Sequence, residues 1–171
     1  FSYGDSAVLY RTNAQSRLLE ERFVRENIPY KIVGGVNFYA RKEIKDLLCY
    51  LKTIDNAQDD LAVKRIINVP KRGIGATTIA KVQDYADENG MSFYAALRQA
   101  EEISTLSKAT ATKIRPFVTF IQMLRSKLPY ISVEQLMDEI IEDTGYVAEL
   151  DAEGTDEARA RIENIDELIS K

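Results

Sequence analysis

The residue types best suited to binding chemistry are Lys71 and Arg72 followed by Gly73-Ile74-Gly75, directly before a new helical pattern. Glycines let the backbone turn tightly and leave its amides uncovered. The positive end of the helix macrodipole and the neighbouring cations attract an anion to the same place. Nothing in this arrangement reads a base edge, so the pattern predicts sequence-independent binding of a nucleic-acid phosphate backbone. On local pattern alone, an ordinary loop before a helix stays an open alternative.

Charge is strongly segregated along the chain, although the formal net charge is −4. Residues 61–81 hold five cations and no carboxylate, and therefore carry +5. Residues 134–171 hold thirteen acids against three cations, a balance of −10 that would repel a polyanion. One face could therefore hold DNA while another avoids it. The alternative is a solvated acidic helical surface beside a loop that happens to be basic.

The composition limits the chemistry that the chain can perform. Histidine is absent, which excludes histidine-based triads, imidazole general bases and the usual zinc sites. Cys49 is the only cysteine and cannot form an internal disulfide. No apolar run is long enough for a membrane span and no secretory leader is present, so we expect a soluble intracellular protein without a membrane partner. The chain begins without methionine and ends inside a helical pattern, so we expect an excised segment of a longer protein.

The first 35 residues have the pattern of a strand, a helix and a second strand. Residues 7–10 and 30–33 are short apolar runs, and an apolar stripe between them predicts a helix from about residue 15 to residue 27. Such a βαβ piece pairs its strands in parallel and buries them on both faces, so it cannot form a domain by itself. We expect further sheet elsewhere in the protein, or poorly supported strands.

Beyond residue 35 the apolar period is helical, and no strand pattern interrupts it. Helices are predicted at residues 41–54, 59–67, 76–89, 92–100, 107–128, 132–143 and 155–170. Gly90, Pro129 and Gly145 supply stop signals between them. Glu43 and Asp46 are expected to form ion pairs on a helix surface. The predicted fold class is mainly α: an irregular helical domain preceded by a small βαβ piece.

Six stretches of the chain carry a family resemblance: residues 7–17, 28–30, 34–35, 38–46, 68–75 and 161–168. In order and spacing they resemble superfamily 1 DNA helicases of the UvrD/PcrA/Rep group, most closely the PcrA type of Gram-positive bacteria. The resemblance implies that residues 1–35 belong to a RecA-like α/β motor domain, called 2A. Residues 36–171 would then form the helical, duplex-binding 2B subdomain, truncated at its C-terminal end.

In this family, ATP binds between two motor domains and drives movement along one DNA strand in the 3′ to 5′ direction while 2B holds the duplex ahead. The resemblance implies a fragment of an ATP-dependent helicase for DNA unwinding and repair, working in the bacterial cytoplasm at the nucleoid. ATP and Mg²⁺ are implied for the parent protein. The chain has no Gly-x-x-x-x-Gly-Lys-Ser/Thr loop and no Asp-Glu magnesium site of the family type, so we expect this fragment to hold no cofactor and to be inactive alone.

The residues predicted to bind duplex DNA are Gly73, Ile74, Gly75, Thr78, Lys71, Arg72, Lys45 and Lys52. Lys45 and Lys52 are seven residues apart, which places both ammonium groups on one helix face. For this pair, a merely solvated face is the alternative. Arg11 and Asn13 resemble residues that line the single-strand channel, with capping and turn formation as the alternative. No residue is assigned a catalytic role or a metal.

Two functional hypotheses from different classes remain open. In the first, the segment binds the backbone of duplex DNA at its junction with single-stranded DNA, beside the rest of the helicase motor. In the second, it is a protein-interaction or autoinhibitory element with little DNA binding of its own, on which repair or replication proteins dock. A small nucleotide-binding enzyme that uses Gly73 and Gly75 is disfavoured, because the loop follows a helix-rich stretch and not a strand.

Overall fold

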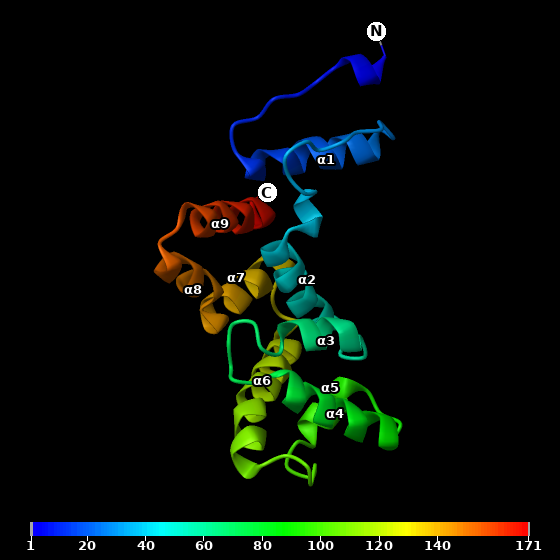
Figure 1. Cartoon of the computed structure of the whole chain (residues 1–171), viewed down its shortest axis with the longest axis vertical. Helices are drawn as coiled ribbons and strands as arrows, with labels where there is room; N and C mark the ends of the chain where they lie inside the picture. The colour runs from blue at the N-terminus through cyan, green and yellow to red at the C-terminus, as the bar shows by residue number, and fades with distance from the viewer. Residues whose placement is uncertain (1, 171) are drawn as a thin grey trace. The chain divides into compact units, whose positions relative to one another are not determined.

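The computed structural model describes residues 2–170, and within that range it is helical and contains no β-strand (Figure 1). The α-helices are α1 (Ser16–Arg25), α2 (Lys42–Asp55), α3 (Asp60–Ile66), α4 (Ala76–Glu88), α5 (Phe93–Arg98), α6 (Lys108–Lys127), α7 (Val133–Thr144), α8 (Tyr146–Glu153) and α9 (Asp156–Ile169). Short 3-10 helices are η1 (Tyr3–Asp5), η2 (Asn13–Gln15) and η3 (Phe38–Ala40). The mainly α fold class is confirmed.

The described residues form two compact units. We call residues 2–45 together with 147–170 the terminal unit, and residues 46–146 the central unit. Helices α2 and α8 each begin in one unit and end in the other, so the chain passes between the units inside helices. The boundary between 2A and 2B that the resemblance places after residue 35 is a different division, and it stays a prediction.

Each helix expected from the apolar period is present, with both ends within two residues of those predicted. Many of these helices start at an N-cap residue whose side-chain oxygen accepts a hydrogen bond from a backbone amide that has no partner inside the helix. In the central unit these caps are Asp59, Ser92, Ser107 and Ser132, which accept from the third helical amide at 3.1 to 3.2 Å.

Gly145 ends α7 as the sequence predicted. Its φ of 68° is a left-handed conformation that favours glycine, and its amide donates to the Ile141 carbonyl at 3.1 Å. The chain turns directly into α8 at Tyr146. Helix α8 was not predicted from the sequence; it follows Gly145 directly and lies in a short acidic stretch.

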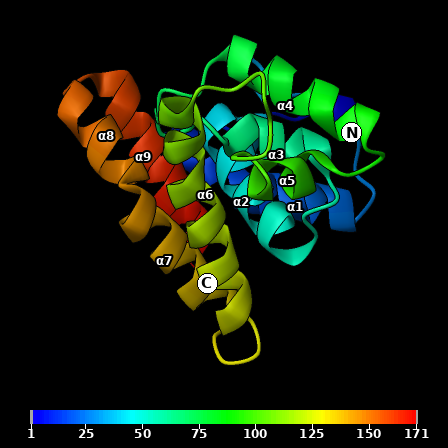
Figure 2. The same ribbon diagram turned by 90° about the horizontal axis from the view of Figure 1, so that it is seen from below.

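The core of the central unit forms around α5, which packs against α3, α4 and α6 (Figures 1 and 2). Its fully buried side chains include Tyr50, Ile66, Phe93 and Phe117. Ile74, in the loop between α3 and α4, is equally buried and anchors that loop to the core. No helix within residues 2–170 is long and apolar enough to cross a membrane.

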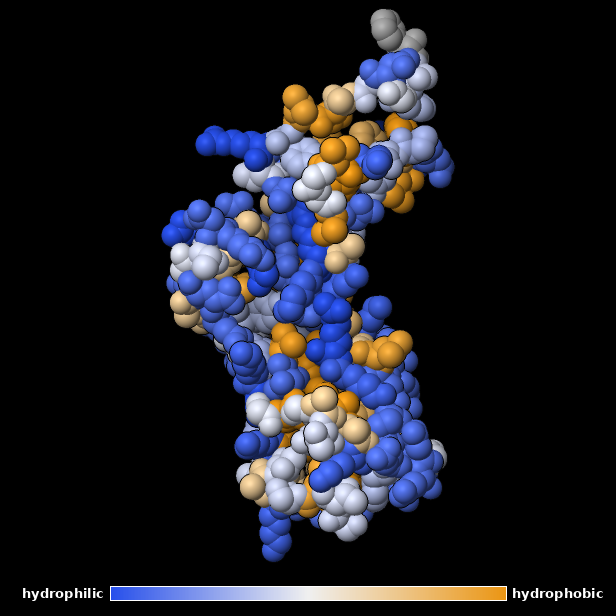
Figure 3. Space-filling model, in the orientation of Figure 1, coloured by the Kyte–Doolittle hydropathy of each residue, from blue (hydrophilic) through white to orange (hydrophobic). Residues whose placement is uncertain are grey.

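The two strands predicted at residues 7–10 and 30–33 are not formed. Both segments are extended, but neither has a ladder partner within residues 2–170. Leu9 is 94% exposed and Val33 is 86% exposed, whereas Ile32 is half-buried. Figure 3 shows apolar side chains at the surface around α1. The helix expected between them is present as α1. The physical reason is the one that makes a βαβ piece incomplete: strand pairing requires neighbouring strands, and no other described segment supplies them.

The terminal unit is held together by a buried polar network, which corrects the prediction that Glu43 lies on a helix surface. Glu43 is only 4% exposed, and its carboxylate accepts from Asn164 Nδ2 of α9 at 2.6 Å. The guanidinium of Arg41 donates to Asn164 Oδ1 at 2.6 Å and to Ser16 Oγ at 2.8 Å. Burial lowers the pKa of Arg41, and the carboxylates of Glu20 and Glu43 oppose that shift.

Asp46 is also buried, although the sequence predicted a surface ion pair. It is 1% exposed, accepts from Arg65 Nε at 2.7 Å and accepts from the Tyr146 hydroxyl at 2.8 Å. These partners come from α3 and from the start of α8, far from Asp46 in the sequence. Glu43 and Asp46 of α2 are therefore buried and hydrogen-bonded inside the units, and they do not form ion pairs on an exposed helix surface.

Candidate nucleic-acid interface

The loop between α3 and α4 presents the start of α4 to solvent. Gly75 is the N-cap of α4 with φ −90° and ψ 177°, and no side chain caps the helix. Among the described residues, the amides of Gly75, Ala76 and Thr77 find no acceptor. Gly75, Ala76 and Thr77 are exposed, and Thr78 is half-buried in the first turn of α4. Uncovered amides at the positive end of a helix dipole form a site that attracts a phosphate.

Gly73 has a structural role that requires glycine. Its φ of 71° lies in the left-handed region, and this turn lets the chain enter α4 directly after the buried Ile74. Gly75 has an ordinary φ, and a β-carbon there would meet nothing within 4 Å. The two glycines of the Gly-Ile-Gly element therefore differ: Gly73 makes the turn, and Gly75 leaves the end of the helix open.

Ile74 packs into the core, and its predicted contact with duplex DNA stays a prediction. Its side chain is fully buried, and its amide donates to Asn68 Oδ1 at 3.2 Å. The same oxygen accepts from the Arg72 amide at 2.8 Å. Asn68 therefore accepts from the amides of Arg72 and Ile74, which the sequence predicted to be uncovered. The uncovered amides begin at Gly75.

The contact of Arg72 with duplex DNA also stays a prediction, and its guanidinium is turned towards the protein. It donates to four oxygens of the central unit: Ile66 O at 3.0 Å, Ile67 O at 3.2 Å, Pro70 O at 3.2 Å and the Tyr50 hydroxyl at 2.6 Å. The guanidinium carbon lies 5.3 Å from the centre of the Phe117 ring. A cation with this many internal partners is not available to a phosphate without breaking them.

Lys113, from α6, is a cation at this surface that the sequence analysis missed. A β-carbon on Gly73 would lie 3.4 Å from Lys113 Nζ, so the lysine lies directly over the turn. Lys113 and Lys71 are both exposed. No sequence signal could have found Lys113, because it lies forty residues beyond the loop on a helix with its own apolar period. The outward cations of this surface are therefore Lys71 and Lys113, not Lys71 and Arg72.

Lys45 and Lys52 are exposed on α2, as their spacing predicted. Lys45 belongs to the terminal unit and Lys52 to the central unit, so the structure brings only Lys52 into the same unit as the Gly73–Gly75 loop. Their contact with duplex DNA stays a prediction.

Arg11 and Asn13 lie in the terminal unit at the start of η2. The Arg11 amide donates to Gln15 Oε1 at 2.9 Å, and the Asn13 carbonyl accepts from Arg41 at 2.8 Å. Both residues are exposed. The turn that was the alternative explanation is therefore present, and a role in binding single-stranded DNA stays a prediction.

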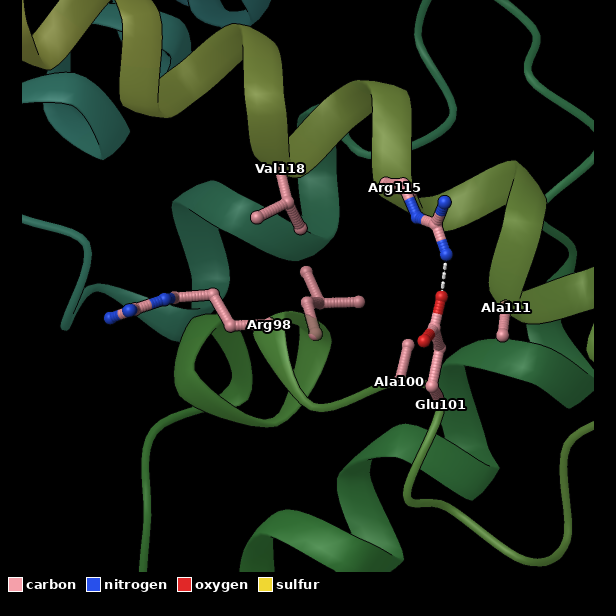
Figure 4. Close-up of a pocket in the computed structure, with 7 residues that line it drawn as sticks. Arg98, Ala100, Glu101, Ala111, Arg115 and Val118 are labelled. Atoms are coloured by element: carbon pink, nitrogen blue, oxygen red, sulfur yellow. Dashed lines mark ion pairs between the residues drawn. The ribbon is translucent and has the colours of Figure 1, made fainter.

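A small cavity of about 70 Å³ lies between α5 and α6 (Figure 4). At its edge Arg115 forms an ion pair with Glu101, while Arg98 points away from that pair. Pockets for small molecules usually measure about 300 Å³ or more, so this cavity cannot hold a nucleotide. Within residues 2–170, no group of three or more acidic or cysteine side chains could hold a metal ion.

Comparison with known proteins shows which family this chain resembles over its length. The family model of the UvrD-like helicase C-terminal domain matches residues 1–171. ATP-dependent DNA helicase PcrA of Staphylococcus aureus strain Mu50 is 49% identical over 168 residues, which cover 98% of this chain and 23% of the relative. PcrA of Staphylococcus epidermidis strain RP62A is 48% identical over the same length. The chain thus spans about a quarter of the length of these curated relatives. It belongs to the family of UvrD-like helicase C-terminal domains.

Proposed function

We propose that this chain is the part of an ATP-dependent 3′ to 5′ DNA helicase that holds duplex DNA by its phosphate backbone. The observation that carries the proposal is the open start of α4, whose uncapped amides follow a turn that Lys113 covers and that the exposed Lys71 precedes. Amides and ammonium groups bind phosphate oxygens without reading bases, which suits a motor that works on any sequence. Thr78 adds a hydroxyl in the first turn of α4.

The charge distribution supports an oriented contact. Residues 134–171 carry −10 and repel a polyanion, whereas residues 61–81 carry +5. A duplex would therefore meet the chain on the side of the α3–α4 loop and avoid the acidic helices. Contacts of this kind orient DNA relative to a motor more than they bind it tightly, so affinity should be modest and salt-dependent.

The exposed apolar side chains of the terminal unit support a further part of the proposal. Leu9 and Val33 have the pattern of strands that are buried on both faces, yet they are exposed here. We assign residues 1–35 to a RecA-like 2A motor domain whose other strands come from the rest of the polypeptide, and residues 36–171 to 2B. ATP and Mg²⁺ would bind elsewhere in that longer protein. Its setting would be the bacterial cytoplasm at the nucleoid, where it acts on junctions of duplex and single-stranded DNA.

The test is fluorescence anisotropy of labelled duplexes with unrelated sequences, titrated with the 171-residue chain at several salt concentrations. If Lys45 and Lys52 contact the duplex together with Lys71 and Lys113, roughly four contacts at about 0.9 released ion each should lower affinity about a hundredfold between 50 and 200 mM salt. The double variant Lys71→Met, Lys113→Met should weaken binding equally for all sequences. Arg98→Met is the matched control, because it removes one exposed cation from α5. If the double variant binds like the wild type, the phosphate contact is wrong.

The acidic charge of residues 134–171 favours a second candidate, a protein-interaction or autoinhibitory element. Its partners would be repair or replication proteins, or the rest of the motor. This candidate predicts partner binding that survives the loss of Lys45, Lys52 and the Gly73–Gly75 loop, whereas the DNA proposal predicts that duplex binding is lost with them. Paired measurements of DNA and partner binding on the same variants separate the two.

A further inference from the structure

Arg72 occupies the centre of the loop that presents the start of α4, but its charge faces inward. Two of its acceptors, the carbonyls of Ile66 and Ile67, lie at the C-terminal end of α3. Carbonyls at a helix C-terminus have no partner inside the helix and carry the negative end of its dipole, so a guanidinium is well suited to satisfy them. Arg72 therefore ties the end of α3 to the beginning of the loop.

Tyr50 and Asn68 complete this arrangement from either side. The Tyr50 hydroxyl accepts from Arg72 at 2.6 Å and donates to the Val69 carbonyl at 2.6 Å. Burial raises the pKa of Tyr50, while Arg72 opposes the shift, so the hydroxyl stays protonated and able to donate at neutral pH. Asn68 Oδ1 accepts from the amides of Arg72 and Ile74. The Phe117 ring lies below the guanidinium.

These contacts fix the backbone on both sides of Gly73. We propose that Arg72 is a positioning residue: together with Asn68 and Tyr50 it sets the loop so that Lys71 and the α4 amides face a DNA phosphate, and it does not touch the DNA itself. This proposal rests on the proposed function, since it concerns how Arg72 holds the α3–α4 loop in the conformation that binds DNA. Binding benefits because a loop that is already ordered loses less conformational entropy when the ligand arrives.

A residue that contacts phosphate and a residue that only positions the loop should differ in the salt dependence of binding. A cation that contacts phosphate releases counterions, so its removal reduces the magnitude of the slope of log affinity against log salt by about 0.9. A residue that only shapes the loop changes affinity and leaves that slope unchanged. Lys71 and Arg72 are adjacent cations, which makes Lys71→Met the matched control for Arg72→Met.

The experiment measures duplex affinity of the 171-residue chain at four or more salt concentrations for the wild type, Arg72→Met, Arg72→Lys, Tyr50→Phe and Lys71→Met. Lys71→Met should lower the slope by about 0.9. Arg72→Met should weaken binding about tenfold at every salt concentration, from the loss of several charge-assisted hydrogen bonds that shape the loop. Arg72→Lys should resemble Arg72→Met, because one ammonium group cannot reproduce the planar fan of donors. Tyr50→Phe should lower duplex affinity about threefold and leave the salt slope unchanged. This variant tests the same contacts if an Arg72 variant folds poorly.

Amide hydrogen exchange on the same variants separates loop positioning from a general loss of stability. The Ile74 amide should exchange faster in Arg72→Met while amides in α6 keep their protection. The inference is overturned if Arg72→Lys binds like the wild type, if Arg72→Met lowers the slope as Lys71→Met does, or if exchange rises equally throughout the central unit. A wild-type chain that shows no salt-dependent duplex binding overturns the proposed function itself, whereas normal binding by both Arg72 variants overturns only the role of Arg72.

Discussion

Replacing Gly75 by aspartate should stabilise the chain and weaken its binding to DNA. Gly75 is the N-cap of α4 in extended geometry, and a β-carbon there meets nothing within 4 Å. An aspartate in that conformation can accept from the amides of Thr77 and Thr78, the second and third residues of the helix. The side chain would therefore place a carboxylate where we propose that the DNA phosphate binds.

The two effects have opposite signs and can be estimated separately. An aspartate N-cap in place of glycine gains a few tenths of a kcal/mol, and a negative charge at the helix start adds about 0.3 to 1 kcal/mol. A gain of about 1 kcal/mol raises the melting temperature of a chain of this size by about 2 to 4 °C. A carboxylate about 4 Å from a phosphate charge costs about 1 kcal/mol in water and about 4 kcal/mol at an effective dielectric constant of 20. Duplex affinity should thus fall at least about fivefold.

The assay pairs thermal unfolding with anisotropy on the same protein preparation. Gly75→Asn caps the helix without adding charge, so it should lose less affinity than Gly75→Asp. Gly75→Ala has no capping oxygen, and it should bind like the wild type with slightly reduced stability. A Gly75→Asp chain that melts higher and still binds duplex with unchanged affinity would show that the α4 amides do not face DNA. That result would refute the reasoning even if DNA binding itself were real.

Three further predictions concern the framework. Arg41→Met should cost about 3 kcal/mol in urea unfolding followed by circular dichroism, because the buried carboxylates of Glu20 and Glu43 lose their cation, whereas Arg159→Met on an exposed ion pair should cost under about 0.5 kcal/mol. Leu9→Ser should change stability by less than about 0.5 kcal/mol and Ile74→Ala should cost about 3 kcal/mol, and a large loss for Leu9→Ser would show that its segment is packed. Tyr39 and Arg17 lower the pKa of Glu21 from 4.5, so this stabilisation is complete above pH 4.5 and is lost as pH falls through the lowered value; Tyr39→Phe should flatten the acid limb of a stability profile, and an unchanged limb would contradict the assignment.

The helices were predictable from the sequence because local information specifies them. Apolar residues at helical spacing gave their extents, and Ser92, Ser107 and Ser132 mark three of their starts. Gly145 marked the end of α7 for the same reason, since a left-handed turn leaves a local signature. These features depend on residues within one or two turns of each other, and a linear sequence displays such neighbours directly.

The burial of Glu43 and Asp46 was not predictable, because the groups that satisfy them are distant in sequence. Asn164 lies 121 residues from Glu43, and Tyr146 lies 100 residues from Asp46. A charged residue beside other charges on a helix normally indicates a solvated face, and pattern analysis cannot see a partner that folding supplies. The strands at residues 7–10 and 30–33 failed for the converse reason: their local pattern is strand-like, but no described segment supplies the pairing.

Residues 61–81 carry five cations, but most of these cations have partners inside the protein and are not free to contact DNA. Of the five cations in residues 61–81, Arg65 is paired with Asp46 and Arg72 is bonded inside the loop. Lys64 lies over the Phe93 ring at 5.1 Å, and Lys81 donates to the Thr105 carbonyl at 2.8 Å.

Within residues 2–170, Lys71 is the exposed cation of this segment that forms no hydrogen bond or ion pair, and Lys113 joins it from α6. Two contacts release about 1.8 ions, which corresponds to a loss of affinity of about tenfold between 50 and 200 mM salt, not a hundredfold. The steeper dependence therefore requires Lys45 and Lys52 to reach the duplex as well. The measured slope thus counts contacts: a value near two ions restricts the interface to the α4 loop, and a value near four extends it along α2.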